Sequence, residues 1–335
     1  MATGATIFGC AGPRLNVHER AFFTRADPWG FILFARNVQN PAQLQGLTAE
    51  LRATVGRDAP VLIDQEGGRV QRLGPPQWRD WTPPLDFARS TGAAAPRAFH
   101  LRYRIIAEEL RNVGIDVNCA PLADIATATT HAFLRDRCYG TDAAQVVARA
   151  CAVAQGLLAG GVLPVLKHIP GHGRAGSDSH AELPLVTADA ETLRATDFVP
   201  FRALADLPMA MTAHVVYGAL DTGGAATLSP VLVDIMRRDI GFEGLLMTDD
   251  IGMGALRGSM AARSRTALKA GCDIILHCSG VLSEMEDVAA AAGTLGPRAA
   301  RRADAALAAR RDAEPVDIAG LEAELEALMN GEGDG

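Results

Sequence analysis

The sequence has few features of a membrane protein or a nucleic-acid-binding protein. Aromatic residues make up only 5% of the 335 residues, and no basic patch with interleaved aromatic residues occurs. The formal net charge of −7 argues against nucleic acid and membrane as partners, because binding to either anionic surface favours a positive protein surface. The longest apolar stretch, residues 157–166, contains two glycines and a proline and is too short to span a bilayer.

Signals of export are also missing from this sequence. Residues 1–5 lack the basic start of a signal peptide. The six cysteines show no paired spacing. Four of them lie in apolar runs, where a thiol packs as a small hydrophobic group: Cys10, Cys119, Cys272 and Cys278. We therefore expect a reduced, cytoplasmic protein without disulfides.

Apolar runs of strand length recur along the chain. They lie at residues 5–10, 31–34, 61–63, 117–121, 162–166, 209–212, 245–248 and 272–276. Most of these runs are continuous rather than alternating, which is typical of strands buried on both faces of a parallel sheet. Helical patterns lie between them; one begins at Asn40-Pro41 and stops at Gly56, and another begins at Asp142 and stops at Gly160.

About eight strand–helix units are the number found in a (β/α)8 barrel, which typically needs about 250 residues. We therefore predict an α/β fold, a single-domain TIM (β/α)8 barrel that spans residues 1–335. The residues beyond those a barrel needs lie mainly in a Pro- and Trp-rich excursion at 73–95 and in extra C-terminal helices at 297–330. We expect residues 331–335 to be disordered. The alternative is an open doubly wound sheet, although no strand leads into a dinucleotide-type glycine fingerprint.

Polar residues follow five successive strands of the predicted barrel. They are the segment 64–72, Asp124 with Arg135-Asp136-Arg137, Lys167-His168, His214, and Asp249-Asp250. Because the active site of such a barrel lies at the C-terminal ends of its strands, these side chains should meet at one mouth. The positive residues supply directional donors, and Asp64 can accept hydrogen bonds from two vicinal hydroxyls. This mixture predicts a ligand rich in hydroxyl groups.

The loop that begins at Lys167 has a high density of titratable residues. Residues 167–180 carry three histidines, a lysine and an aspartate on glycine-rich backbone, which indicates chemistry rather than packing. Asp178 can set the tautomer and the basicity of His180, two residues later. The glycines Gly171, Gly173 and Gly176 predict that the loop brings His180 in after a sugar binds.

Other interpretations of these residues remain open. His168 and His172 are four residues apart, as in a metal site, but Pro170-Gly171 breaks any helix between them. His172 can simply brace the loop, and His214 can face a ligand or be an interior histidine with satisfied hydrogen bonds. Of the pair at 249–250, only one side chain can face the barrel axis, because successive strand residues point to opposite faces.

Five motifs occur in order between residues 64 and 253. They are Asp64-Gln65-Glu66-Gly67-Gly68-Arg69-Val70-Gln71-Arg72, Lys167-His168-Ile169-Pro170-Gly171-His172-Gly173 with Asp178-Ser179-His180, Met211-Thr212-Ala213-His214, Ala226-Thr227-Leu228-Ser229, and Thr248-Asp249-Asp250-Ile251-Gly252-Met253. Together they make the chain similar to a glycoside hydrolase family 3 β-N-acetylglucosaminidase of the single-domain bacterial peptidoglycan-recycling type. Cys138 and Gly252 stand where this family often has small polar residues.

The resemblance implies roles for particular residues. Asp249 matches the nucleophile, His180 the general acid/base, and Asp178 the partner of that histidine. The residues that would hold the sugar are Asp64, Arg72, Arg137, Lys167 and His168, with His214 as a further candidate for substrate binding. Asp249 would attack the anomeric carbon while His180 protonates the leaving oxygen, so that the anomeric configuration is retained after a second displacement by water.

The implied function is that of a retaining exo-β-N-acetylglucosaminidase. Its substrates would be peptidoglycan-derived muropeptides in which N-acetylglucosamine is linked to anhydro-N-acetylmuramic acid. We expect no cofactor, no metal, and a monomer whose only partner is this small carbohydrate. One alternative is a phosphorylase, because a histidine acid/base carries no negative charge to repel phosphate. Two others are a metal-dependent barrel hydrolase and a sugar-binding protein without catalysis.

Overall fold

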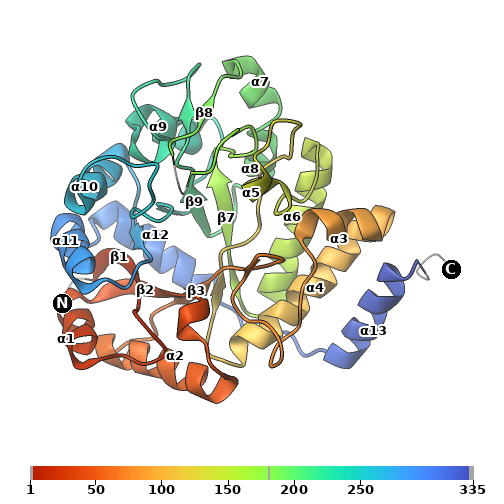
Figure 1. Ribbon diagram of the computed structural model, residues 1–335, viewed down its shortest axis with the longest axis horizontal. Coiled ribbons are helices and arrows are strands. Elements are labelled where there is room, and N and C mark those ends of the chain that lie inside the picture. The colour runs from red at the N-terminus through yellow and green to blue at the C-terminus, as the bar shows by residue number, and fades with distance from the viewer. Residues whose placement is uncertain (1–2, 180–181, 332–335) are drawn as a thin grey trace.

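The computed structural model describes residues 3–179 and 182–331 and shows a ring of parallel strands surrounded by helices (Figure 1). The barrel strands are β1 (Gly4–Gly9), β2 (Pro28–Leu33), β3 (Val61–Ile63), β6 (Val117–Asn118), β7 (Leu163–Ile169), β9 (Met209–Thr212), β11 (Leu245–Met247) and β12 (Ile275–His277). They form one eight-stranded sheet in the order β11-β9-β7-β6-β3-β2-β1-β12, in which all neighbouring strands are parallel. A parallel bridge between Met247 and Ile274 joins β11 to the start of β12.

Because this bridge connects the two ends of the sheet, the predicted (β/α)8 barrel is confirmed and the open doubly wound alternative is wrong. Each of the eight apolar runs of the sequence overlaps a barrel strand. The helices that follow the strands are α1 (Val17–Ala26), α2 (Pro41–Val55), α4 (Ala95–Arg111), α6 (Ala143–Ala159), α7 (Ala190–Ala195) with α8 (Val199–Ala203), α9 (Pro230–Arg238), α10 (Met260–Ala270) and α11 (Leu282–Ala292).

Helix limits follow the capping signals of the sequence. The Asn40 side chain accepts a hydrogen bond from the backbone N–H of Gln43 at 2.9 Å, and α2 ends at Gly56, whose φ of 63° suits glycine. Asp142 caps α6 in the same way, through the N–H of Gln145 at 2.9 Å. These caps satisfy backbone groups that a helix end leaves without partners, so the helices begin where the sequence predicts.

Short elements fill the longer connections. They are η1 (Ala35–Asn37), β4 (Gln65–Gly67), β5 (Val70–Gln71), α3 (Pro84–Thr91), η2 (Gly92–Ala94), α5 (Ala132–Arg135), β8 (Leu185–Val186), β10 (Val216–Tyr217) and η3 (Ala226–Leu228). The antiparallel pair β4–β5 and the helix α3 belong to the segment after β3, which includes the excursion predicted at 73–95. Pairs β4–β5 and β8–β10 lie outside the barrel sheet.

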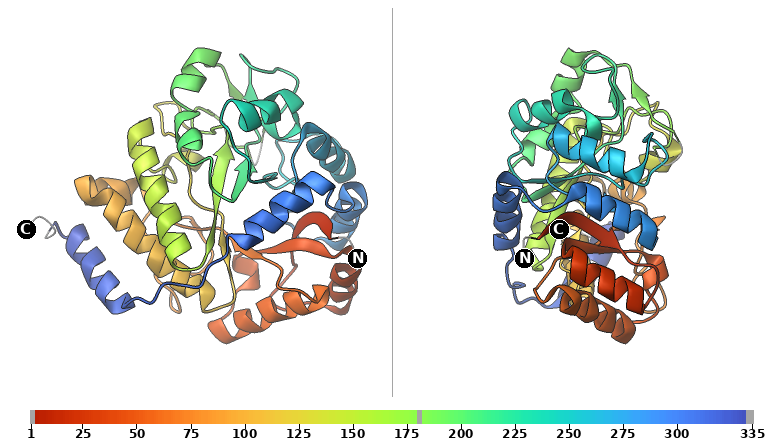
Figure 2. Two further views of the ribbon diagram at one scale, coloured as in Figure 1. Left: turned by 180° about the vertical axis from the view of Figure 1, so that it is seen from behind. Right: turned by 90° about the vertical axis from the view of Figure 1, so that its left-hand side faces the viewer.

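The core has two layers. One cluster fills the barrel interior with side chains from the strands, and a larger one lies between the strands and the outer helices. Ala303 and Ala306 belong to the interior cluster together with Trp29 of β2. They come from α12 (Pro297–Ala308), which runs across the barrel in the view from behind (Figure 2). The helix therefore closes the end of the barrel opposite the C-terminal ends of the strands.

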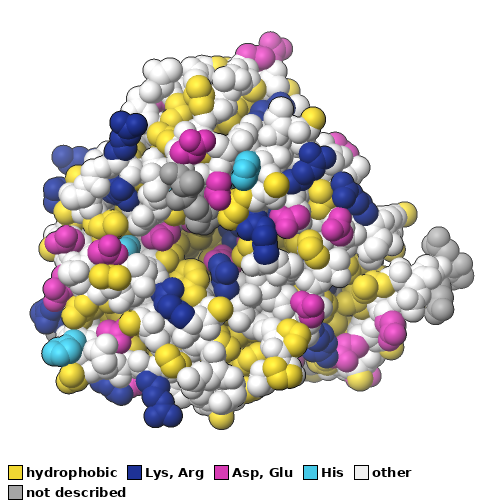
Figure 3. Space-filling view, in the orientation of Figure 1, with side chains coloured by type: hydrophobic (Ala, Val, Ile, Leu, Met, Phe, Trp, Pro, Cys, Tyr) yellow, Lys and Arg dark blue, Asp and Glu magenta, His cyan; other side chains and the backbone are white. Residues whose placement is uncertain are grey.

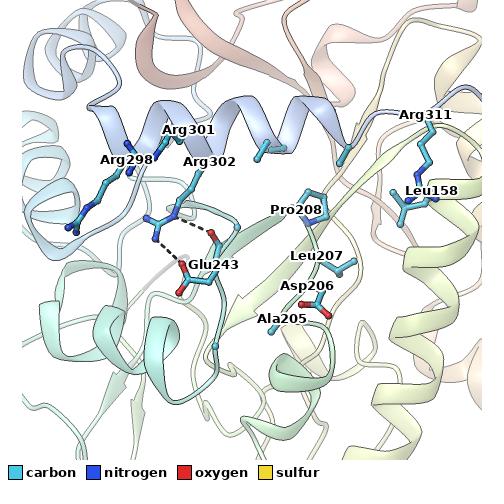
Figure 4. Close-up of a pocket in the computed structure, with 15 residues that line it drawn as sticks. Leu158, Ala205, Asp206, Leu207, Pro208, Glu243, Arg298, Arg301, Arg302 and Arg311 are labelled. Atoms are coloured by element: carbon cyan, nitrogen blue, oxygen red, sulfur yellow. Dashed lines mark hydrogen bonds and ion pairs between the residues drawn. The ribbon is translucent and has the colours of Figure 1, made fainter.

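The two C-terminal helices have different contacts. On α12, Arg302 donates to the carbonyl oxygen of Glu243 at 3.1 Å (Figure 4). It also donates to the carboxylate of Asp273 at 3.1 Å. The second helix, α13 (Ile318–Met329), lies against α4 and α3, where Glu324 pairs with Arg97 at 2.7 Å. Of the terminal residues expected to be disordered, 332–335 lie outside the described part of the chain.

Two further expectations concern cysteines and membranes. All six cysteines lie in the described part of the chain and are free thiols. Within residues 3–179 and 182–331, none of the helices has the length and apolar character needed to cross a membrane.

Candidate active site

A cavity of about 320 Å³ opens at the C-terminal ends of the barrel strands. Six of the predicted site residues line it: Asp64, Arg72, Arg137, Lys167, His168 and Asp249. Figure 3 shows this face of the molecule hollowed at its centre, with basic and acidic side chains around the hollow. The structure thus brings together side chains from β7 and from the loops after β3, β6 and β11, as expected for a barrel active site.

Lys167 is the centre of an ion-pair network on the cavity wall. Its Nζ lies 2.8 Å from Oδ1 of Asp64 and 2.6 Å from Oε1 of Glu66. Burial by itself would lower the pKa of Lys167, but the two carboxylates raise it well above its ordinary value. The ammonium therefore keeps its charge inside the protein, with a fixed position and a third N–H available for a ligand.

Arg137 and Arg72 complete this network. The Arg137 guanidinium donates to both oxygens of Glu66 at 2.8 Å, and Arg72 donates to Oδ2 of Asp64 at 3.2 Å. Burial would raise the pKa values of both carboxyl groups, but the neighbouring cations bring both below their ordinary values. Asp64 consequently remains ionised and able to accept hydrogen bonds from hydroxyl groups.

His168 is oriented by a buried carboxylate. Its Nδ1–H donates to Oδ2 of Asp124 at 2.8 Å, while the other Asp124 oxygen accepts the backbone N–H of His172 at 2.6 Å. Burial would raise the pKa of Asp124, but His168 holds it below its ordinary value. Because Nδ1 is occupied, Nε2 is the ring atom of His168 that is available to a ligand in the cavity.

The structure distinguishes the two aspartates after β11. Asp250 Oδ1 accepts the backbone N–H groups of Gly252 at 3.0 Å and Cys278 at 3.1 Å, so this side chain ties its own loop to β12. Asp249 Oδ1 accepts the N–H of Asp250 at 2.8 Å. Burial would raise the pKa of Asp249, but His214 and His168 lower it below its ordinary value. Asp249 is therefore an ionised carboxylate with a fixed position in the cavity wall.

His214 does not line this cavity, although the sequence made it a candidate for substrate binding. It is fully buried, its Nδ1 shares a hydrogen bond with Thr227 Oγ1 at 2.7 Å, and its Nε2–H donates to the Asp250 carbonyl at 3.0 Å. Burial lowers the pKa of His214, in spite of the nearby Asp249. The ring has both nitrogens occupied by protein atoms and supports the loop that carries Asp249.

The predicted acid/base residue, His180, lies outside the described residues. The residues before it are well anchored. Ser179 is buried, its hydroxyl lies 3.1 Å from Nε2 of His172, and its carbonyl accepts the N–H of Ala255 at 3.3 Å. Asp178 lies in the same turn, where its carbonyl accepts the N–H of Glu182 at 3.0 Å. The loop between β7 and β8 therefore contacts the loop between β11 and α10, which carries Asp249.

Sequence reasoning assigned no role to two buried carboxylates, Glu66 and Asp124. Glu66 balances Lys167 and Arg137, and Asp124 orients His168. The number of charges could have pointed to Glu66. The sequence predicts three cations around a single acid, Asp64, and buried cations in that number require a second acid to balance them. Asp124 was visible only as a polar residue after the fourth strand, and the sequence did not show that its partner is an imidazole in the next strand.

Apolar side chains form the rest of the wall. Phe34 and Phe133 line the cavity, and the guanidinium of Arg69 lies 4.0 Å from the centre of the Phe133 ring. The same arginine pairs with Asp136 at 3.4 Å. Such flat apolar surfaces beside charged groups suit the ring faces of a sugar.

Metal ligation was a competing interpretation of the histidines. In residues 3–179 and 182–331, no cluster of three or more His, Cys, Asp or Glu side chains is arranged to hold a metal ion. Asp124 accepts a hydrogen bond from the imidazole of His168 and another from the backbone N–H of His172. The arrangement is a hydrogen-bond network around a carboxylate.

Comparison with known proteins gives a consistent result. Residues 14–308 match the glycosyl hydrolase family 3 N-terminal domain. A beta-hexosaminidase from Alkalilimnicola ehrlichii is 36% identical over 285 residues, covering 83% of this chain and 82% of that protein. One from Methylococcus capsulatus is 35% identical over 299 residues, covering 86% and 88%.

Solved structures agree with these relatives. The crystal structure of NagZ from Neisseria gonorrhoeae in complex with N-trifluoroacetyl-D-glucosamine has a TM-score of 0.83 and 30% identity. The match covers 99% of this chain and 98% of that one. With the barrel, its polar cavity and a family match that spans most of the residues, this chain belongs to glycosyl hydrolase family 3.

Proposed function

We propose that this protein is a retaining exo-β-N-acetylglucosaminidase that removes terminal, non-reducing N-acetylglucosamine from peptidoglycan-derived muropeptides. The observation that carries the proposal is the position of the ionised Asp249 in a cavity whose other polar residues suit a sugar. The named activity of the curated beta-hexosaminidases and the amino sugar bound by the Neisseria NagZ support the same substrate class.

The polar network would hold the sugar by its hydroxyl groups. Asp64 has one oxygen on Lys167 and the other on Arg72, and each oxygen keeps a lone pair for a vicinal hydroxyl. On β7, Lys167 donates from its ammonium group. His168 beside it gives its Nδ1–H to Asp124, so the Nε2 of the neutral ring accepts a hydrogen bond from a sugar hydroxyl. Since these groups are held by ion pairs within the protein, little reorganisation is needed when the sugar binds.

The size of the cavity favours exo action. A volume of about 320 Å³ lies near the lower limit for ligand sites and suits one amino sugar rather than a polysaccharide chain. The wall closes around the non-reducing sugar with Asp64, Lys167 and Arg137, and the aglycone would leave through the open side near Phe133 and Arg69.

Asp249 attacks the anomeric carbon, and His180 protonates the leaving oxygen. A glycosyl-enzyme ester forms, and the neutral imidazole then removes a proton from the water that resolves it. A carboxylic acid in this role needs a raised pKa, whereas the ordinary pKa of histidine, about 6.5, already suits proton transfer near neutrality. Asp178 stabilises the imidazolium. The contact between Ser179 and Ala255 supports this pairing of loops.

The test is hydrolysis of an aryl N-acetyl-β-D-glucosaminide, followed by NMR from the first seconds. A retaining enzyme releases the β-anomer first. Asp249→Ala should reduce kcat by at least about 10⁴-fold, in the range seen when a nucleophile is removed. Release of the α-anomer first, or an active Asp249→Ala variant, would refute the mechanism. Asp239→Ala is a suitable control, because Asp239 pairs with Arg194 on the outer surface.

The same assay separates the remaining alternatives. Added phosphate should not increase turnover or yield a sugar 1-phosphate, as it would for a phosphorylase. A chelator should leave the rate unchanged, and turnover itself would exclude a binding protein. With a muropeptide as substrate, release of N-acetylglucosamine would establish the natural substrate class.

We also propose that the protein acts in the cytoplasm and as a monomer. The six free thiols support a reducing compartment. Cell fractionation tests the compartment, and light scattering after gel filtration tests the monomer.

A further inference from the structure

Another buried histidine lies close to Asp250, the residue after the nucleophile, and has no part in the mechanism above. His277 ends β12 and is fully buried, between the cavity-lining residues Leu276 and Cys278. Its Nδ1 lies 3.7 Å from Oδ1 of Asp250, the residue next to Asp249. The other ring nitrogen, Nε2, lies 2.9 Å from Ser279 Oγ and 3.3 Å from Glu284 Oε2.

The hydrogen bonds around Ser279 determine the tautomer of His277. The Ser279 hydroxyl donates to Glu284 Oε2 at 2.8 Å and accepts the backbone N–H of Val281 at 3.1 Å. Its single proton is used, so Nε2 of His277 must be the donor in their shared hydrogen bond. The neutral ring then has no proton on Nδ1, and this buried atom has no hydrogen-bond partner among the described residues.

Protonation of Nδ1 changes the interaction with Asp250. A neutral ring presents a lone pair to the carboxylate, whereas an imidazolium presents an N–H that attracts it. Bringing the two atoms from 3.7 Å to a normal charge-assisted hydrogen bond requires a movement of roughly 0.9 Å. Asp250 Oδ1 already accepts the N–H groups of Gly252 and Cys278, so movement of this oxygen disturbs the loop that carries Asp249.

We propose that His277 is a positioning residue for the nucleophile and acts as a proton switch: neutral, it leaves Asp250 on its backbone donors, and protonated, it draws Asp250 away and lowers activity. The proposal rests on the function proposed above only in naming Asp249 as nucleophile. His277 does not line the cavity, so its effect passes through Asp250.

The groups around His277 set the pH at which the switch operates. Charged groups face it from three elements: Asp250 from the loop after β11, Glu284 from α11, and Arg36 from η1. On β1, the ring of Phe8 packs edge-on against the imidazole at 6.4 Å. Burial lowers the pKa of His277, and the two carboxylates oppose this effect. Activity should therefore fall as the pH drops below the ordinary histidine range.

The kinetic test compares the pH dependence of kcat for three variants on an aryl N-acetyl-β-D-glucosaminide. His277→Gln keeps a donor toward Ser279 but cannot titrate, so the acid limb should move to lower pH. Glu284→Gln removes a charge that favours the imidazolium, and should move the limb in the same direction by roughly half to one unit. Glu286→Gln, on the same helix and paired with Arg25 at the surface, should leave the limb unchanged.

A second measurement does not depend on turnover. The ¹⁵N shift of the Gly252 amide, which donates to Asp250, should titrate with the His277 ring in the wild type and lose this step in His277→Gln. The proposal would be overturned if the acid limb of the kcat profile lay at the same pH in wild type, His277→Gln and Glu284→Gln. It would also be overturned if the Gly252 amide shift titrated in the same way in wild type and in His277→Gln. A protein that titrates as described but hydrolyses no glycoside would refute the proposed function alone.

Discussion

The backbone N–H of Ala255 donates to the carbonyl oxygen of Ser179 at 3.3 Å, across 76 residues of sequence. This hydrogen bond joins the loop after β7 to the loop after β11. The residue after Ser179 is the proposed acid/base, and the second loop carries the proposed nucleophile, Asp249, at its second position. The two partners of the reaction are therefore carried by segments that touch each other.

Replacing His180 with Ala should affect substrates according to their leaving groups. General acid catalysis contributes roughly 10²–10⁴-fold, and a poor leaving group depends on it most. We expect a loss of that size in kcat/KM for an alkyl or disaccharide glycoside and a much smaller loss for a dinitrophenyl glycoside. Equal losses for both classes would show that His180 is not the acid. His18→Ala, an exposed position on α1, is the control.

Glu66→Gln should impair both the site and the fold. The substitution keeps the side chain's size but leaves Lys167 and Arg137 with one fewer buried negative charge. Breaking a buried ion pair from one side costs about 3–5 kcal/mol, and KM should rise because both cations lose their fixed positions. Denaturant unfolding and steady-state kinetics measure these effects.

Glu109→Gln is the matched control for that experiment. Glu109 is also largely buried and pairs with an arginine, Arg79, at 2.7 Å, but it lies outside the cavity. The Glu109→Gln variant should have a lower free energy of unfolding than wild type and an unchanged KM. An unchanged KM in Glu66→Gln would contradict the role of this carboxylate in ordering the sugar site.

His172 should make the protein less stable in acid. Burial lowers its pKa to about 4, whereas the unfolded chain binds this proton near pH 6.5. Between these values the unfolded state carries more protons, so stability falls as pH drops and is unaffected above about pH 6.5. The contribution at pH 4 is on the order of 3 kcal/mol. His172→Gln should therefore lose less Tm than wild type between pH 7 and pH 4.5; parallel curves would contradict the assignment.

Arg302→Ala should reduce stability without affecting catalysis. Arg302 links α12 to Glu243 (Figure 4) and to the buried Asp273, at the end of the barrel away from the active-site cavity. Asp273 keeps a second arginine, Arg237, at 2.7 Å, so the loss should be about 1–3 kcal/mol. Thermal unfolding should show the decrease while kcat/KM stays within about twofold. A large kinetic effect would show that the two ends of the barrel are coupled.

The sequence by itself determined the elements and most of the cavity. Strands that are buried on both faces must be apolar throughout, so the runs at 5–10 or 209–212 are visible without a structure. Polar groups directly after such runs are then expected at one end of the barrel. Asp64, Lys167 and the pair at 249–250 could be placed by this rule alone, because their positions follow from local strand limits, whereas the choice of Asp249 within the pair came from the family resemblance.

Only the tertiary structure decided how these groups pair. Glu66 meets Lys167 after a separation of 101 residues, and Asp250 rather than Asp249 is tied to Cys278, the residue directly after β12. His214 turned inward to Thr227 and the Asp250 carbonyl, and α12 came to close the far end of the barrel. Each outcome depends on charges and hydrogen-bond donors from segments distant in sequence, which become neighbours only when the barrel closes.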